Sequence, residues 1–107
     1  MKVRLADIAH ARSGDKGDTA NVGIIALRRE WYDLIARELT ERRVADHFRG
    51  VITGAVQRYE LPNLLAFNFV LYDVLGGGAS RSLRIDSQGK TLALQLLELE
   101  VPKPEKT

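Results

Sequence analysis

Ala20-Asn21-Val22-Gly23-Ile24-Ile25-Ala26-Leu27, a mostly apolar run rich in β-branched residues, decides the fold class of this 107-residue chain. Its composition and short length predict a buried strand. Over residues 30–48 the pattern changes to helical spacing, which four apolar side chains share: Trp31, Leu34, Ile35 and Leu39. A buried strand that leads into an amphipathic helix predicts a domain that mixes both kinds of element.

The remaining segments extend this mixture in both directions. Residues 3–9 predict a first strand and residues 55–61 another. Residues 63–75 predict a second helix, because the span is long, begins after Pro62 and ends at Gly76-Gly77-Gly78. A strand buried on both sides is the alternative there. Residues 82–86 and 91–101 predict a final hairpin with a bulge near Leu96, and a helix is the alternative for its second half.

The predicted order is therefore strand, strand, helix, strand, helix, strand, strand. This order favours an α+β fold, a two-layer sandwich with a mixed or antiparallel sheet of about four to five strands and two helices on one face. We expect a single domain over residues 1–101 and a flexible tail over residues 102–107, which holds two prolines and no apolar residue besides them.

The composition excludes several classes of protein. Zero cysteines exclude disulfides, thiolate metal sites and cysteine nucleophiles. A formal net charge of +2 is too small to indicate nucleic-acid binding. His10 and His47 are too few and too far apart to indicate a zinc site. The apolar stretch 64–75 is short for a membrane span and contains Asn68 and Asp73. Asp7, His10 and Arg12 interrupt any apolar run after Lys2 and Arg4, so we expect no secretory signal and a cytoplasmic protein.

The most unusual segment runs from Arg12 to Asn21, and its first part, residues 12–19, is predicted as a polar loop between two strands. Its glycines permit positive φ, and such a loop can aim backbone N–H groups at an anion while a lysine supplies charge. The candidate ligand-binding residues here are Ser13, Gly14, Asp15, Lys16, Gly17, Asp18, Thr19 and Asn21. A solvated structural turn is the alternative.

Asp15, Asp18 and His10 are the candidate catalytic residues. A histidine titrates near neutral pH and can act as a general base beside a carboxylate. The two aspartates are also candidate ligands for Mg²⁺, which commonly takes one or two carboxylates together with water and substrate. No other metal and no resident cofactor are expected.

A second polar cluster follows the predicted second helix. Gly77 and Gly78 permit close approach of the backbone to a ligand, and the Arg81 guanidinium is suited to a carboxylate or phosphate. A helix C-cap with a connector is the alternative. The predicted helix itself is apolar all round, so its outer face needs a cover, which a homo-oligomer or a larger partner subunit would supply.

A family resemblance adds to these observations. The run from Leu5 to Ile24, centred on Ser13-Gly14-Asp15-Lys16-Gly17-Asp18, resembles the small ferredoxin-fold domain of the acyclic terpene utilisation protein A family. Residues 58–64, 68–71 and 75–84 look like that family too, so the likeness spans residues 2–101. It implies a ferredoxin-like fold, whose core order β-α-β-β-α-β differs from the order predicted above.

The resemblance also implies a functional setting. In that family the domain often stands behind a much larger domain, and the family is linked to bacterial breakdown of acyclic terpenes through acyl-CoA intermediates. We therefore expect an accessory small subunit that associates with a larger catalytic protein of this type, and whose Gly/Asp/Lys loop contributes to a shared site for an acyl-CoA or carboxylate. One alternative is a self-sufficient homo-oligomeric enzyme that uses Asp15, Asp18 and His10. The other is a small-anion binding module without chemistry.

Overall fold

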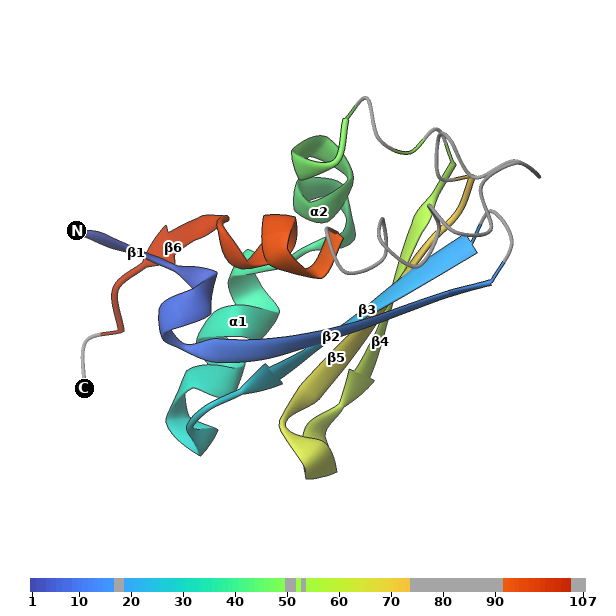
Figure 1. Ribbon diagram of the computed structural model, residues 1–107. Coiled ribbons are helices and arrows are strands. Elements are labelled where there is room, and N and C mark those ends of the chain that lie inside the picture. Colours follow the sequence, from blue (N-terminus) through green and yellow to red (C-terminus); the bar gives the residue numbers. More distant parts are fainter. Residues whose placement is uncertain (17–18, 50–51, 53, 74–91, 105–107) are drawn as a thin grey trace.

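A four-stranded antiparallel sheet forms the centre of the computed structural model, which describes residues 1–16, 19–49, 52, 54–73 and 92–104 (Figure 1). The strands lie in the order β2-β3-β5-β4. Their bounds are Ala9–Lys16 for β2, Thr19–Ala26 for β3, Val56–Leu61 for β4 and Ala66–Leu71 for β5. A separate antiparallel ribbon pairs β1 (Lys2–Arg4) with β6 (Glu100–Pro102). The α+β fold class is confirmed.

The polar loop predicted over residues 12–19 is wrong for residues 12–16 and 19, because these residues belong to two paired strands. Lys16 pairs with Thr19, and the register continues unbroken to Ala9 opposite Ala26. Two residues, Gly17 and Asp18, separate the last pair in the sequence and lie outside the described residues. The strands are therefore longer than their polar composition suggested.

The first predicted strand, residues 3–9, is divided in two. β1 ends at Arg4, and a 3-10 turn, η1 (Leu5–Asp7), leads into β2. The Asp7 carboxylate accepts the Arg4 N–H at 3.0 Å, which stabilises this turn. The Leu5 N–H donates to Leu99 O at 2.7 Å and so extends the small ribbon before the chain enters the large sheet.

The long helix predicted over residues 30–48 is interrupted. A 3-10 turn, η2 (Arg29–Trp31), precedes α1 (Tyr32–Glu38), and α2 (Glu41–His47) follows. Leu39 leaves helical geometry at φ −94° and ψ 68°, and Thr40 caps α2 by accepting the Arg43 N–H at 3.1 Å. Threonine is a favoured N-cap residue, so a local sequence signal for the break was present.

The second predicted helix, residues 63–75, is also wrong. After a 3-10 turn, η3 (Pro62–Leu64), the chain turns at Leu65, whose φ is 53°, and forms β5 between β3 and β4. Phe67, Phe69 and Leu71 are fully buried on one face of this inner strand. The apolar residues Phe67, Phe69 and Leu71 are thus buried by the chain's own helices and strands, and a partner is not needed to explain their composition.

At the C-terminal end, residues 92–97 are helical, as the alternative predicted, and the bulge near Leu96 is wrong. Leu92 and Leu96 are buried four residues apart on one helical face, whereas Leu94 is 64% exposed. The His47 ring Nε2 donates to Gln95 O at 2.6 Å and ties this helix to α2. The other predicted strand of that hairpin, residues 82–86, lies outside the described residues.

The three helices lie on one face of the large sheet (Figure 1). Along β3 the side chains of Ala20, Val22, Ile24 and Ala26 are buried, whereas Asn21, Gly23 and Ile25 between them are more exposed. This period of two assigns the first set to the core and the second to the opposite face. No described helix or strand covers that opposite face, which we call the open face. No helix in the described ranges is long and apolar enough to cross a membrane.

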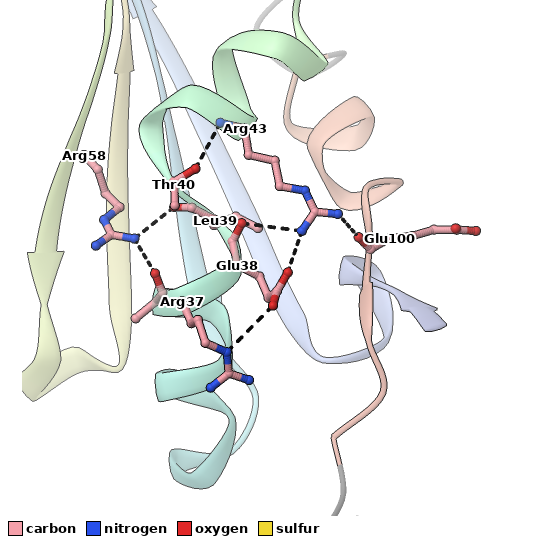
Figure 2. A network of polar contacts seen from close by, with 8 residues as sticks. Arg37, Glu38, Leu39, Thr40, Arg43, Arg58 and Glu100 are labelled. Atoms are coloured by element: carbon pink, nitrogen blue, oxygen red, sulfur yellow. Dashed lines mark hydrogen bonds and ion pairs between the residues drawn. The ribbon is translucent and has the colours of Figure 1, made fainter. Parts of the chain in front are cut away.

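Arg58 of β4 links the sheet to the end of α1 (Figure 2). Its guanidinium donates to Ala36 O at 2.7 Å and to Leu39 O at 2.9 Å, and forms an ion pair with Glu60 at 2.7 Å. The same guanidinium carbon lies 5.3 Å from the centre of the Phe67 ring. These contacts satisfy carbonyl groups that the end of a helix otherwise leaves without partners.

Arg43 makes the corresponding link on the other side of the helices (Figure 2). It pairs with the Glu38 carboxylate at 2.8 Å and donates to the backbone carbonyl of Glu100 in β6. Arg58 and Arg43 therefore connect the α1–α2 junction to the large sheet and to the small ribbon. These connections hold the helices on one face of the large sheet.

Candidate functional site on the open face

Most of the predicted ligand-binding residues lie on the β2–β3 hairpin. β2 carries His10, Ser13, Gly14, Asp15 and Lys16, and β3 carries Thr19 and Asn21. Gly17, Asp18, Gly77, Gly78 and Arg81 lie outside the described residues. The hairpin register brings Gly14 opposite Asn21 and Lys16 opposite Thr19.

Strand alternation divides these residues between the two faces of the sheet. Ser13 lies opposite the buried Val22 and so belongs to the helix side. Arg12 and Gly14 alternate with Ser13 and belong to the open face. Residues 12–16 are therefore not one cluster, because the even-numbered positions of β2 belong to the open face and the odd-numbered positions to the helix side.

The candidate catalytic residues His10 and Asp15 are five positions apart on β2. An extended strand of that length spans roughly 17 Å, and alternation puts the two positions on opposite faces of the sheet, so the structure does not bring these two residues together. Among the residues that the structure describes, no group of three or more histidine, aspartate or glutamate side chains is arranged to hold a metal ion.

An amide pair beside two glycines occupies the centre of the open face. Asn21 Nδ2 donates to Asn68 Oδ1 at 3.1 Å, across the boundary between β3 and β5. Gly23 lies opposite both Arg12 and Asn68, so the guanidinium-bearing and amide-bearing positions flank a residue without a side chain. A Cβ added at Gly14 would lie 3.1 Å from Asn21 Oδ1, so glycine at this position gives the amide room.

A second hydrogen-bonded group lies next to this pair on β4 and just after β5. The phenols of Tyr59 and Tyr72 both donate to Gln57 Oε1, at 2.8 and 2.9 Å. Because this oxygen already accepts two bonds, Gln57 offers its NH₂ group to a ligand. The same holds for Asn68: its side-chain oxygen accepts a hydrogen bond from Asn21, so its NH₂ group is the one it can offer to a ligand.

None of the side chains described on the strands of the open face is acidic. These residues are His10, Arg12, Gly14, Thr19, Asn21, Gly23, Ile25, Gln57, Tyr59, Leu61, Ala66, Asn68 and Val70. One exposed guanidinium and two NH₂ groups thus face solvent without a neighbouring carboxylate on the same surface. Such a donor-rich surface suits an anion.

A groove of about 540 Å³ lies on the helix side of the same sheet edge, between β2 and the helix at residues 92–97. We call it the β2 groove. Its lining residues are Ala11, Arg12, Ser13, Ala93, Leu94 and Leu97. Arg12 and Ser13 therefore both border the groove, and Arg12 also belongs to the open face.

Three residues of the open face were not predicted as site residues from the sequence: Gln57, Tyr59 and Asn68. They lie on β4 and β5, and the pairing of β3 with β5 is what brings them close to the hairpin residues 12–21. The available signal was the alternation of Asn68 between Phe67 and Phe69, which is a strand period rather than a helical one.

A comparison with protein families bears on these observations. A family model described as the AtuA ferredoxin-like domain matches residues 3–102. The chain belongs to this family. The match covers nearly the whole chain, including the open face and the β2 groove of this AtuA ferredoxin-like domain. No curated protein and no solved structure matches the chain.

Proposed function

We propose that this AtuA ferredoxin-like domain is an accessory subunit of a larger AtuA-type catalytic protein that acts in the breakdown of acyclic terpenes or related organic acids. In this role its open face contributes to the binding of an anionic group, namely a carboxylate or the phosphates of an acyl-CoA. Family membership supports the setting, because the match covers residues 3–102. The enclosed strand β5 gives no support to it.

One observation carries the anion-binding part of the proposal. The open face presents the Arg12 guanidinium together with the NH₂ groups of Asn68 and Gln57, and among the described residues no acidic side chain belongs to this face. A guanidinium forms charge-assisted hydrogen bonds with carboxylates and phosphates, and its planar fork matches their geometry. Gly14 and Gly23 leave the backbone beside these donors accessible to a flat group.

Calorimetric titration with free CoA, an acyl-CoA and the matching free acid tests this part. Arg12→Ala is expected to weaken binding of the anion about tenfold, because it removes a charge-assisted bond. Arg42→Ala is the matched control, since Arg42 is an exposed arginine on α2, in the helix layer. Unchanged affinity in the Arg12 variant would remove the open face as the binding surface.

The accessory role is tested separately by co-expressing the chain with a larger AtuA-type protein and measuring their comigration in size-exclusion chromatography. A stable complex is the expected result. If the chain binds the anion without forming a complex, it is a small-anion binding module and the accessory role is contradicted.

A further inference from the structure

One row of residues crosses the open face from one edge of the sheet to the other. Arg12 of β2 pairs with Gly23 of β3, and Gly23 pairs with Asn68 of β5. Asn68 pairs in turn with Tyr59 of β4. Adjacent strands lie roughly 4.8 Å apart, so the row measures about 14 Å between its end positions. A guanidinium and an aromatic ring therefore belong to opposite ends of one row, which we call the Arg12–Tyr59 row.

Tyr59 provides an exposed aromatic ring at one end of this row. The residue is 49% exposed, although its hydroxyl is bonded within the protein. That hydroxyl donates to Gln57 Oε1 at 2.8 Å, two positions back on the same strand, so the ring leans along β4. The Tyr72 hydroxyl donates to the same oxygen at 2.9 Å, which fixes the Gln57 amide further. A ring that is held in place and exposed is a surface on which a flat aromatic ligand can stack.

Gly23, in the middle of the row, is a glycine that the fold does not require. A Cβ added there would lie 3.8 Å from Arg12 O and 3.9 Å from Phe67 O, which are ordinary contact distances. Glycine inside a strand weakens it, and such a residue often marks a place where a ligand approaches the backbone closely. Between Arg12 and Asn68 the open face therefore has a floor of bare backbone.

Asn68 lies between this floor and the tyrosine. Its side-chain oxygen accepts from Asn21 Nδ2 at 3.1 Å, which orients the amide and leaves its NH₂ group as the donor that it offers. The ring nitrogens of a purine are acceptors for such a donor. From one end to the other, the row thus offers a charged donor for phosphate, bare backbone, a neutral donor and an aromatic ring.

We propose that the ligand of the open face is a purine nucleotide laid along the Arg12–Tyr59 row. Its base stacks on Tyr59 with one edge at the Asn68 NH₂ group, its sugar crosses Gly23, and its phosphate meets the Arg12 guanidinium. This inference rests on the proposed function and narrows it. An acyl-CoA contains an adenosine that carries phosphates, whereas a free carboxylic acid has no base to stack.

The charge of the face suits one nucleotide and not a nucleic-acid strand. Among the described side chains of the open face, Arg12 is the residue with a permanent positive charge, and the formal net charge of the chain is +2. A strand carries a phosphate at every nucleotide and needs several lysines or arginines to neutralise them. A single guanidinium matches the phosphates of one small molecule.

Calorimetric titration with three probes tests the proposal: ADP, inorganic pyrophosphate, which has the same phosphates and no base, and a short oligoadenylate. ADP is expected to bind at least tenfold more tightly than pyrophosphate, because base–aromatic stacking adds to the phosphate contact. Equal affinities would overturn the purine assignment and leave anion binding intact. No binding of either probe would overturn both this inference and the phosphate part of the proposed function. An affinity that rises with each nucleotide added to the oligoadenylate would mean that the occupant is a strand, and would contradict the proposal.

Two substitutions at Tyr59 separate the ring from its hydroxyl. Tyr59→Leu is expected to abolish the preference for ADP and to leave the affinity for pyrophosphate within about twofold, because it removes the stacking surface alone. Tyr59→Phe keeps the ring and is expected to retain the preference. Arg12→Ala, in contrast, is expected to weaken the binding of both probes. A preference for ADP that survives in Tyr59→Leu overturns the assignment of the base to this ring.

Gly23→Ala tests the bare floor, and it decides the matter if a Tyr59 variant fails to fold by circular dichroism. Because a Cβ fits at this position, the unfolding temperature is expected to stay the same or to rise. The added methyl group occupies the path of the sugar, so the affinity for ADP is expected to fall about tenfold. Leu64→Ala is the matched control, because Leu64 is 67% exposed at η3, outside the strands of the open face. Unchanged affinity for ADP in the Gly23 variant would contradict the placement of the nucleotide along the row.

Discussion

The two edge strands of the large sheet, β4 and β2, differ in the residues that lie against their outer sides. At the β4 edge, the Glu41 carboxylate of α2 accepts the Arg58 N–H at 2.7 Å, and the Arg58 guanidinium donates into the end of α1 (Figure 2). At the β2 edge, small side chains and a partly exposed Leu94 border a groove. The chain thus satisfies the outer side of β4 with its own charged residues, whereas among the described residues no charged side chain bonds to the backbone of β2.

The difference lies in how the described residues satisfy the outer side of each edge strand. A backbone N–H that is already bonded to a carboxylate has no capacity for a neighbouring strand, whereas an unprotected regular edge keeps that capacity. The β4 edge is therefore closed by polar contacts that contribute to stability, whereas the described surroundings of the β2 edge are the small side chains and the apolar residues of the β2 groove. Each of the following predictions tests one side of this contrast.

The largest effect is expected from Arg58→Ala at the β4 edge. The side chain is 19% exposed, donates to two carbonyls at the end of α1 and stacks on Phe67, so its loss leaves polar groups without partners and removes packing. We expect a loss of about 3 kcal/mol in the free energy of unfolding. Urea unfolding followed by circular dichroism measures it.

Two variants make this measurement specific. Arg42→Ala on the exposed side of α2 is expected to change stability by less than about 0.5 kcal/mol. Arg58→Lys is expected to recover only part of the loss, because an ammonium lacks the planar fork that reaches two carbonyls and an aromatic face. A loss in Arg58→Ala no larger than that in Arg42→Ala would contradict the assigned role of the β4 edge.

The fold class and the first half of the sheet were predictable from local sequence, because β3 is a β-branched run whose even-numbered residues all reach the core. The misread segments share one cause. In β2 the residues that signal a loop, Ser13 and Gly14, sit in a strand because β3 pairs with them along their whole length. Pairing is a long-range effect, and local propensity does not report it.

The wrong prediction of a helix over residues 63–75 had the same cause. Its consequence was larger, because Asn68 of the candidate site lies in this segment. Phe67, Asn68 and Phe69 alternate as a strand does, but their apolar neighbours mask the period. Once β5 is misplaced, the contact between Asn21 and Asn68 cannot be anticipated. Conversely, the helix break at Thr40 could have been predicted from the local sequence, because threonine is a favoured N-cap residue.

A pair of glycine substitutions sharpens the contrast between the two edges. A Cβ at Gly54, just before β4, would lie 2.6 Å from Asp73 Oδ2 and 2.7 Å from Tyr72 O, which is backbone and cannot move away. Gly54→Ala is therefore expected to cost about 2 kcal/mol. At Gly14 on β2, the nearest atom is a side-chain oxygen of Asn21 at 3.1 Å, so Gly14→Ala is expected to cost less than about 0.5 kcal/mol. Equal losses in thermal unfolding would show that the β2 side is as tightly packed as the β4 side.

A smaller effect is expected from Glu41→Ala, which removes the acceptor of the Arg58 N–H. We expect a loss of about 1 kcal/mol together with a new tendency to associate at high concentration, because the β4 edge then has an unbonded donor. Glu30→Ala is the matched control, since Glu30 is an exposed acid in the η2 turn. Light scattering measures the association, and no difference between the two variants would mean that helix α2 alone covers this edge.

The smallest effect concerns Tyr32, which stacks on Phe67 with ring centres 4.5 Å apart beside the Arg58 contacts. Burial raises the pKa of this phenol above its ordinary value of 10.0, the Glu60 carboxylate raises it further, and Arg58 opposes them. The folded protein thus holds this proton to higher pH than the unfolded chain, so the associated stability is present below pH 10 and is lost as pH rises through the folded pKa.

Tyr32→Phe keeps the stacked ring but cannot ionise, so its stability is expected to fall less between pH 9 and pH 11 than that of the unmodified chain. Parallel urea titrations at these two pH values measure the difference, and an identical fall in both proteins would mean that the ring is as accessible to ionisation in the folded state as in the unfolded one.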